Sequence, residues 1–319
     1  MPAITVAIAD GAVACPALAQ SSDLLGPTDH ATIQGGINAA VDTKTVCVEA
    51  GTYYENIDLQ GKAIHLLGGD GPDATVIDAG GSGSVVTIAS GEGADTIVEG
   101  FTVTNGSATD GGGFYVEYSS PTITDMVVVG NSASDDGGGV CLWAADATMT
   151  NVEFQGNSAG DDGGGLYLFS GDLDLTNGIF ESNEAVVDGG GLRTNQSTMT
   201  IANTTCQANT AGAEGGGLQA YSCGGTLTNV AFDGNSAGTH GGGVHMNSTG
   251  VSLTNVRVAG NDAVNGGGGL YLYYSSPPLT NVTIQGNSVS DVRCGIYGYS
   301  VHSTMTNLTI AGDSAVTDG

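Results

Sequence analysis

A repeat of fixed length constrains the fold of this sequence more than any other feature. Glycine triplets begin at intervals of 26 residues without slippage, at Gly111, Gly137, Gly163, Gly189, Gly215, Gly241 and Gly267. Asparagines keep the same step, in one column at Asn105, Asn131, Asn157, Asn183, Asn209, Asn235, Asn261 and Asn287, and in a second at Asn151, Asn177, Asn203, Asn229, Asn255, Asn281 and Asn307. A fixed period of this length indicates one structural unit stacked on copies of itself.

The repeat unit is composed of short strands. Within residues 163–188, apolar residues alternate with other residues at Leu166, Leu168, Leu173 and Leu175. Alternation at a period of two is typical of β-strands, and no part of the repeat has the periodicity of an amphipathic helix. We predict strands over residues 166–169, 173–176 and 178–181, with the glycine triplet at a turn where side chains would not fit.

Equal three-strand units predict an all-β parallel β-helix of about ten or eleven coils, in which each strand pairs with its equivalent in the next coil. Three apolar columns support this arrangement, and we expect all of their members to face the interior. They are Phe114, Val140, Leu166, Leu192, Leu218, Val244, Leu270 and Ile296; Ile123, Met149, Leu175, Ile201, Leu227, Leu253, Leu279 and Met305; and Val128, Phe154, Phe180, Cys206, Phe232, Val258, Ile284 and Ile310. Stacked asparagine amides both donate and accept, so we expect their columns to form hydrogen-bonded ladders at buried corners.

The glycine triplet and a following aliphatic residue are combined with Phe-x-x-Asn motifs at Phe154–Asn157, Phe180–Asn183 and Phe232–Asn235. This combination resembles the repeats of the chlamydial polymorphic outer-membrane proteins and, more broadly, the pectin-lyase-like superfamily of right-handed parallel β-helices. Thr32-Ile33-Gln34, Val48-Glu49-Ala50-Gly51-Thr52-Tyr53 and Glu55-Asn56-Ile57 are similar to the opening of many secreted β-helix proteins. The resemblance covers the chain from about residue 30 onward and implies a fold rather than an activity, because the superfamily contains lyases, hydrolases, epimerases, adhesins and tail spikes.

The chain divides into an N-terminal segment and one long domain. We predict an arm or cap over residues 1–30 and a single β-helix domain over residues 31–319, with looser coils over 46–105 and regular coils over 105–319. Residues 31–41 fit a short helix with Ile33 and Ile37 on one face, which would close the first coil.

The first 22 residues have two interpretations. Ala17-Leu18-Ala19-Gln20 resembles the cleavage end of a signal peptide, but no positive region precedes it and Asp10 interrupts the apolar run. The segment is therefore either the remnant of a signal peptide or an ordered strand or arm.

Charge restricts the environment of the protein. The formal net charge is −28, because the chain has 33 acidic residues and only five Lys and Arg residues. Such a surface repels nucleic acid and anionic membranes, and no apolar run approaches the roughly 20 residues of a membrane-spanning helix. We predict a secreted or cell-surface protein whose partner is a glycan or another copy of itself.

The six cysteines show neither a disulfide framework nor the spacing of a zinc site. Cys206 stands in a column of phenylalanines, which predicts a buried thiol. Cys141 is expected to point outward between Tyr115 and Tyr167. Cys15 and Cys47 form the pair most worth testing as a disulfide.

The outward positions of the first strand predict a ligand-binding surface. Aromatic residues concentrate there, and exposed aromatic stripes stack on sugar rings or bury a partner. The alternative is that aromatic residues suit strands and stack on one another. The candidate ligand-binding residues are Tyr115, Trp143, Tyr167, Phe169, Arg193, Tyr221, His245, Tyr271, Tyr273, Tyr297 and Tyr299.

A polysaccharide lyase or other carbohydrate-active enzyme of the pectin-lyase-like type is the alternative function. In that interpretation Arg193 is the base, and Glu117 and His245 assist it. The repeats carry no long insertions that could form the wall of a cleft. We therefore assign no catalytic residue and expect Arg193 and His245 to contact a ligand.

Acidic residues form a column just before the glycine triplets. Carboxylates one coil apart repel each other, and calcium would remove that repulsion by bridging them and nearby carbonyls. The alternative is a row of solvated turns in which each Asp bonds to glycine N–H groups. The candidate calcium ligands are Asp110, Asp135, Asp136, Asp161, Asp162, Asp188 and Glu214.

Together these features predict an extracellular structural or adhesive protein, with a plain glycan-binding module as a further alternative. The final coil offers Met305, Leu308 and Ile310 beside unpaired strand edges, and the sequence stops at Asp318-Gly319 in phase with the repeat. We expect head-to-tail stacking into filaments, with residues 1–22 pairing across the joint. Alternatively, the chain is a fragment of a longer protein whose next domain covers that edge.

Overall fold

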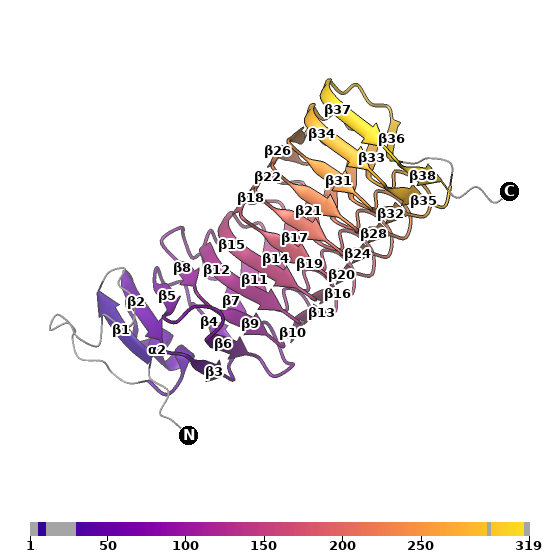
Figure 1. The fold of residues 1–319 in the computed structure, drawn as a ribbon. Helices are drawn as coiled ribbons and strands as arrows, with labels where there is room; N and C mark the ends of the chain where they lie inside the picture. Colours follow the sequence, from indigo (N-terminus) through magenta and orange to yellow (C-terminus); the bar gives the residue numbers. More distant parts are fainter. Residues whose placement is uncertain (1–5, 11–29, 292–294, 316–319) are drawn as a thin grey trace.

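A computed structural model of the protein describes residues 6–10, 30–291 and 295–315. The chain winds into a solenoid whose coils stack along one axis (Figure 1). From the second coil onward, strands pair in parallel with their equivalents in neighbouring coils, in three sheets that we name A, B and C. The predicted all-β parallel β-helix is therefore confirmed.

Sheet B contains the first strand of each coil and has 10 strands in the described part of the chain. The predicted strand over residues 166–169 is observed with those bounds, and Leu166 pairs with Leu192 one coil further on. The strands are β4 (Ile57–Asp58), β7 (Val86–Ile88), β11 (Phe114–Glu117), β14 (Val140–Trp143), β17 (Leu166–Phe169), β21 (Leu192–Asn195), β25 (Leu218–Tyr221), β29 (Val244–Asn247), β33 (Leu270–Tyr273) and β36 (Ile296–Tyr299).

Sheet A has 19 strands among the described residues. They are β1 (Val6–Asp10), β2 (Lys44–Val48), β3 (Gly51–Tyr53), β5 (His65–Gly68), β6 (Thr75–Asp78), β8 (Ile97–Glu99), β9 (Thr102–Thr104), β12 (Thr122–Val129), β15 (Ala147–Gln155), β18 (Asp172–Thr176), β19 (Ile179–Glu181), β22 (Thr198–Ala202), β23 (Thr205–Gln207), β26 (Gly224–Thr228), β27 (Ala231–Asp233), β30 (Ser252–Thr254), β31 (Arg257–Ala259), β34 (Leu279–Gln285) and β37 (Met305–Ala311). The two other predicted strands, 173–176 and 178–181, correspond to β18 and β19, which share this sheet on either side of Asn177.

Sheet C consists of two-residue strands that the sequence pattern did not indicate, because two residues are too few to show alternation. It has nine strands in the described chain, and those from β10 to β32 each precede a glycine triplet. They are β10 (Ser107–Ala108), β13 (Ser132–Ala133), β16 (Ser158–Ala159), β20 (Glu184–Ala185), β24 (Thr210–Ala211), β28 (Ser236–Ala237), β32 (Asp262–Ala263), β35 (Ser288–Val289) and β38 (Ser314–Ala315).

A short helix closes the first coil, as predicted. α2 (Ile33–Ala39) begins after Thr32, whose Oγ1 accepts a hydrogen bond from the N–H of Gly35 at 3.0 Å. Ile33 and Ile37 are fully buried in the core. The helix therefore places apolar side chains over the open end of the solenoid.

The strand β1 pairs antiparallel with β2, from Val6 opposite Val48 to Asp10 opposite Lys44. This pairing covers the edge of sheet A in the first coil. Residues 6–10 thus pair within their own chain, which differs from the expected pairing across a joint between copies. The rest of the expected arm, residues 1–5 and 11–22, lies outside the described residues, as do Asp318 and Gly319.

The predicted contrast between loose and regular coils is visible in the strand register. Thr45 pairs with His65 and His65 pairs with Ile97, so successive N-terminal steps differ in length. From Thr122, which pairs with Thr148, the steps become uniform.

The three apolar columns line the interior, and Phe154 stacks on Phe180 with ring centroids 4.4 Å apart. The prediction of burial is wrong at the last described coil, where Met305 and Ile310 are half exposed and Ile296 is partly exposed. Among the described coils, only the preceding one packs against these three side chains.

The first asparagine column forms a buried ladder from Asn131 to Asn287. Asn183 Nδ2 donates to Asn209 Oδ1 at 3.0 Å and to the carbonyl of Phe154 at 2.8 Å. Its Oδ1 accepts from both the backbone N–H and the Nδ2 of Asn157, at 3.0 Å each. The predicted ladder is therefore confirmed for this column.

Two parts of the asparagine prediction are wrong. Asn105 is exposed, because Thr104 pairs with Val129 and Asn105 therefore falls opposite Gly130 rather than in the ladder. The second column forms side-chain hydrogen bonds between coils, as expected, but it is exposed instead of buried. Its members, such as Asn177 with a φ of 58°, make left-handed turns that asparagine tolerates better than most residues.

The cysteines differ in environment. Cys206 is a buried free thiol, as predicted, and Cys141 is also buried, so its expected outward exposure is wrong. Cys47 is disulfide-bonded. Cys15, the partner expected for it, lies outside the described residues.

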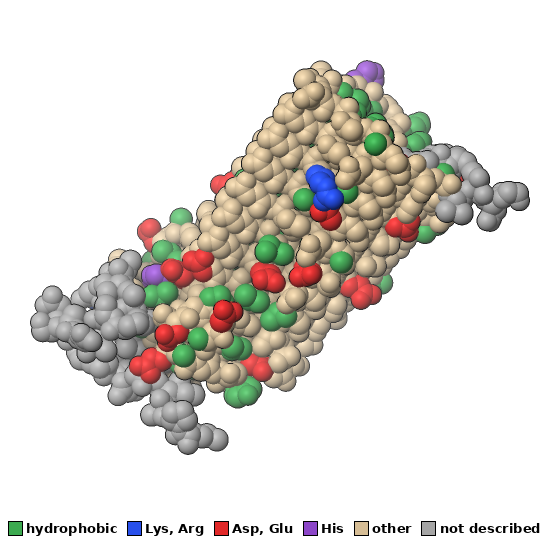
Figure 2. Space-filling model, in the orientation of Figure 1, with side chains coloured by type: hydrophobic (Ala, Val, Ile, Leu, Met, Phe, Trp, Pro, Cys, Tyr) green, Lys and Arg blue, Asp and Glu red, His purple; other side chains and the backbone are tan. Residues whose placement is uncertain are grey.

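Surface charge is unevenly distributed. On the face shown in Figure 2, acidic and hydrophobic side chains gather over the N-terminal half of the described solenoid, and basic side chains appear in one place. Among the described basic residues, Arg257 is ion-paired with Asp233.

Candidate functional site

The outward positions of sheet B form two rows with different surroundings. The inner row is Tyr115, Cys141, Tyr167, Arg193, Gln219, His245, Tyr271 and Tyr297, and the outer row is Glu117, Trp143, Phe169, Asn195, Tyr221, Asn247, Tyr273 and Tyr299. The parallel register places each member beside its counterpart one coil away.

Glycine turns cover much of the inner row, so the predicted exposure is wrong for five of its members, whereas Tyr115, Arg193 and Tyr297 are partly exposed. Gly163 has a φ of 69°, and a Cβ at that position would lie 2.8 Å from the Cβ of Tyr167. Only glycine allows the turn to lie so close over the strand. The buried members are Cys141, Tyr167, Gln219, His245 and Tyr271.

The outer row contains the accessible aromatic side chains, and we call Trp143, Phe169, Tyr221, Tyr273 and Tyr299 the aromatic row. Trp143 is 36% exposed, Tyr221 38% and Tyr299 47%. The rings of Trp143 and Phe169 lie 4.5 Å apart, and those of Tyr273 and Tyr299 lie 5.3 Å apart in a stacked arrangement. Trp143, Tyr221 and Tyr299 are exposed and Phe169 and Tyr273 are partly exposed, and ligand binding by the row stays a prediction.

The acidic column is held together by hydrogen bonds from backbone to side chain. Asp110 Oδ1 accepts the N–H of Asp136 at 3.2 Å, and Asp136 Oδ1 accepts the N–H of Asp162 at 3.1 Å. The same bond links Asp188 and then Glu214 to the preceding acid, at 3.0 and 2.9 Å. Each carboxylate thus accepts a backbone N–H from the next coil, which differs from the expected bonding to glycine N–H groups in its own turn.

Basic residues of the inner row neutralise one end of this column. Arg193 Nε lies 2.9 Å from Asp162 Oδ2, and its guanidinium reaches Asp188 Oδ2 at 3.8 Å. His245 Nδ1 lies 3.1 Å from Glu214 Oε2. Arg193, expected to contact a ligand, is therefore a counter-charge beneath the turns. His245, for which the same was expected, contacts the carboxylate of Glu214 there. Strand register would have revealed this, because Arg193 and His245 each lie 31 positions, one coil plus five residues, after the acid that they contact.

The pKa values in the column reflect this distribution of charge. Burial raises the pKa of Asp188 to about 6, although the Arg193 guanidinium opposes the change. Burial alone would raise the pKa of Glu214, but the neighbouring imidazoles of His240 and His245 lower it overall. Burial lowers the pKa of His245 to about 4, so this imidazole is neutral at pH 7.

Asp136 has carboxylate neighbours and no basic partner among the described residues. Burial and the charges of Asp162 and Asp135 raise its pKa to about 7. The folded state therefore binds this proton more tightly than the unfolded state, whose value is near 3.8. The associated stability is complete below that pH and is lost as the pH rises through about 7.

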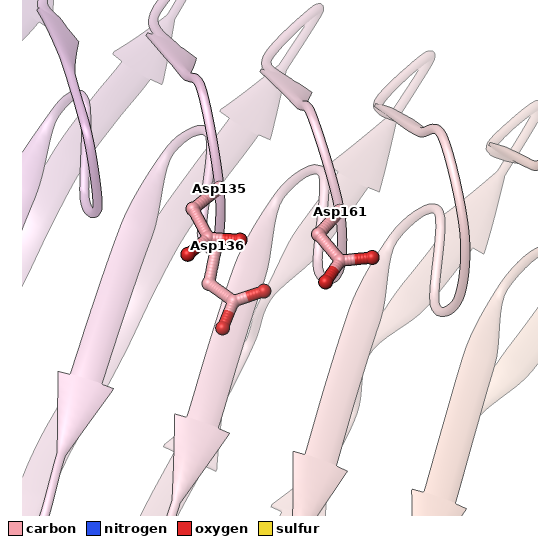
Figure 3. Close-up of side chains that lie close together, drawn as sticks. All are labelled: Asp135, Asp136 and Asp161. Carbon is pink, nitrogen blue, oxygen red and sulfur yellow. The ribbon is translucent and has the colours of Figure 1, made fainter.

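Three of the candidate calcium ligands lie close together. Asp135 and Asp136 on one turn and Asp161 on the next can place one carboxylate oxygen each within 4.8 Å of one another (Figure 3). Oxygen ligands of this kind suit calcium, which takes six to eight of them. The structure does not bring the other candidates, Asp110, Asp162, Asp188 and Glu214, into this group. Calcium binding by the three residues stays a hypothesis.

Comparison with known proteins supports the sequence resemblance over a short stretch. Residues 151–168 match the model of the Chlamydia polymorphic membrane protein repeat. No curated protein matches the chain. Within the described residues, no helix is long and apolar enough to span a bilayer.

Solved structures with similar folds are distant. ORF18 of Geobacillus virus E2 is 14% identical with a TM-score of 0.40, over 88% of this chain and 56% of that one, so this chain spans about half of the length of ORF18. The A-module of mannuronan C-5 epimerase AlgE6 from Azotobacter vinelandii is 13% identical with a TM-score of 0.37, over 87% and 94%. The AlgE4 A-module of the same organism is 17% identical with a TM-score of 0.32, over 89% and 91%. Similarity at this level assigns no activity.

Proposed function

We propose that this chain is a secreted or cell-surface protein that binds an extended, uncharged polysaccharide along the aromatic row. The observation that carries this proposal is the line of accessible rings on one edge of sheet B, from Trp143 to Tyr299. Aromatic faces stack on the apolar faces of sugar rings. An adhesive role follows if the polysaccharide belongs to another surface.

The spacing of the row supports an extended ligand. Tyr221 stands two coils from Phe169 and two coils from Tyr273, which is about 10 Å in each direction at one strand spacing per coil. That distance is close to the length of two sugar units in an extended β-1,4-linked chain. Asn195 and Asn247 occupy the intervening coils, where their amides can bond to sugar hydroxyl groups.

The charge of the protein favours an uncharged polysaccharide. The net charge of −28 repels polyanions such as uronate polymers. Glu117 extends the outer row at its N-terminal end, and Arg193 lies in the inner row engaged with Asp162. A uronate ligand would therefore meet repulsion, and the described residues of this surface offer it no available basic partner.

Two observations support an extracellular compartment. A repeat shared with the Chlamydia polymorphic membrane proteins covers residues 151–168, and those proteins are membrane-associated by name. Cys47 is disulfide-bonded, and disulfides persist mainly in oxidising compartments. Head-to-tail stacking of copies is no part of this proposal, because β1 already covers the edge of β2.

Affinity gel electrophoresis tests the proposal. Wild-type protein should be retarded by soluble β-glucan, xyloglucan or mannan and not by alginate or pectate. Replacing one ring, as in Trp143→Ala, should weaken binding about twofold to tenfold, and Trp143→Ala combined with Tyr221→Ala and Tyr273→Ala should abolish retardation. Tyr54→Ala, an exposed tyrosine outside the row, is the matched control. Retardation that persists in the triple variant, or no retardation by any neutral polysaccharide, contradicts the proposal.

A further inference from the structure

An elongated groove on the outer face of sheet A lies apart from the aromatic row and the acidic column. Its volume is about 860 Å³. His65 pairs with Ile97, Ile97 with Thr122, Thr122 with Thr148 and Thr148 with Asp174, so the lining residues come from five successive coils. Four strand spacings correspond to a length of roughly 19 Å.

The floor of the groove is aliphatic and one end has a wall. Leu67, Val127 and Ile179 line it, and Ile179 is 40% exposed. The loop over residues 69–73 closes the N-terminal end, where Thr102 Oγ1 donates to the carbonyl of Pro72 at 2.7 Å. The loop belongs to the irregular coils, so the uniform repeats gave no indication of it.

Carboxylates stand along the whole length of the groove. Asp73, Glu99, Asp125 and Glu153 line it, whereas none of the described lining residues is Lys or Arg. His65 Nε2 lies 2.8 Å from Glu99 Oε2. The other three acids make no ion pair within the described chain, so the groove has a net negative charge.

We propose that this groove binds an extended peptide segment of another protein that carries basic and aliphatic side chains. A strand rises about 3.3 Å per residue, so roughly six residues span the groove. Lys or Arg side chains would pair with Glu99, Asp125 and Glu153, and aliphatic side chains would contact Val127 and Ile179. Asn151 and Asn177 offer side-chain amides to the peptide backbone, because each amide has a second N–H beyond the one used in its column.

Two alternative occupants fit the groove less well. Sugar rings stack on aromatic side chains, and no aromatic residue is found among the described lining residues. A second copy of this chain has a net charge of −28, so it does not supply the complementary positive charge. The N-terminal segment of the same chain does not supply it either, because residues 1–29 contain neither Lys nor Arg. The partner is therefore a different, basic protein, and this inference is independent of polysaccharide binding by the aromatic row.

Fluorescence anisotropy with synthetic probes tests the inference. The probe is a labelled hexapeptide in which lysine and valine alternate, and the comparison probes are its glutamate–valine counterpart and a labelled glucosamine hexamer. The lysine peptide should bind most tightly, and its affinity should fall as the salt concentration rises. No binding of the lysine peptide, or tighter binding of the glucosamine hexamer, overturns the proposal.

Charge-matched variants separate the groove from the general charge of the surface. The groove variant combines Glu99→Gln, Asp125→Asn and Glu153→Gln, and the control combines Asp172→Asn, Asp174→Asn and Glu184→Gln, all exposed acids outside the groove. An exposed ion pair changes affinity by a factor of about 1.5 to 5, so the groove variant should bind roughly tenfold more weakly and the control should bind within about twofold of wild type. Equal losses in both variants, or no loss in the groove variant, overturn the proposal, and circular dichroism verifies that both remain folded.

Discussion

The buried asparagine ladder is expected to contribute more to stability than its small side chains suggest. In Asn183→Ala, four hydrogen bonds disappear, two that Asn183 donates to Asn209 and Phe154 and two that it accepts from Asn157. Each net contribution is about 1 kcal/mol, and the buried N–H of Asn157 loses the partner it has in the ladder, which costs about 1–3 kcal/mol more. We therefore expect a loss of roughly 5–7 kcal/mol in the free energy of unfolding.

The second asparagine column provides the matched control. Asn177 donates one hydrogen bond to Asn151 at 2.9 Å from an exposed position. Asn177→Gly keeps a residue that accepts its φ of 58° and should cost less than about 1 kcal/mol. Urea titration followed by circular dichroism compares the two variants, with the slope checked because solenoids can unfold in stages. If Asn183→Ala is no more destabilising than Asn177→Gly, the ladder is not a major source of stability and the reasoning fails.

Three further predictions concern the core, the acidic column and metal. Phe180→Ala should lose roughly 3–5 kcal/mol in the same titration, since the side chain is fully buried against Phe154; a loss under 1 kcal/mol would place it outside the core. Asp136→Asn removes a carboxylate whose pKa is raised to about 7 by burial, so it should stabilise the fold by about 1–2 kcal/mol at pH 8, allowing for solvent screening, and have little effect at pH 4; a gain of equal size at both values would refute the assignment. Calcium should raise the melting temperature of the wild type but not of Asp135→Asn combined with Asp161→Asn, and an unchanged wild-type melt would leave only solvated turns.

The fold was predictable because successive coils repeat the same sequence pattern at the same interval. Column membership of Leu175 and Phe180 followed from period alone, and the structure buries both. The two-residue strands of sheet C were not predicted, because two residues are too few to show an alternating pattern. Asn105 was misplaced because the coil that contains it is one residue shorter than its successors, as the pairing of Thr104 with Val129 shows.

The candidate site was predictable only in part. Alternation along a strand gives the side of the sheet on which a residue lies, and it correctly placed Trp143 and Arg193 on the outer side of sheet B. It cannot show whether another turn folds over that side, which is why the ion pair between Arg193 and Asp162 was not predicted. The groove on sheet A was not predicted for a similar reason, because the loop that forms its wall belongs to a coil outside the regular repeat.

Uniform coil length has a consequence for how such a chain can diversify. Each ladder bond joins residues separated by 26 positions, so recombination that removes or duplicates one whole coil restores every column. Loss of a single residue within a strand would instead turn the core side chains on one side of the deletion outward. Every gained or lost coil between Phe169 and Tyr273 would shift the two ring pairs by one strand spacing, about 4.8 Å. Adding or removing whole coils would therefore change the distance between surface contacts in equal steps, while each contact itself stays the same.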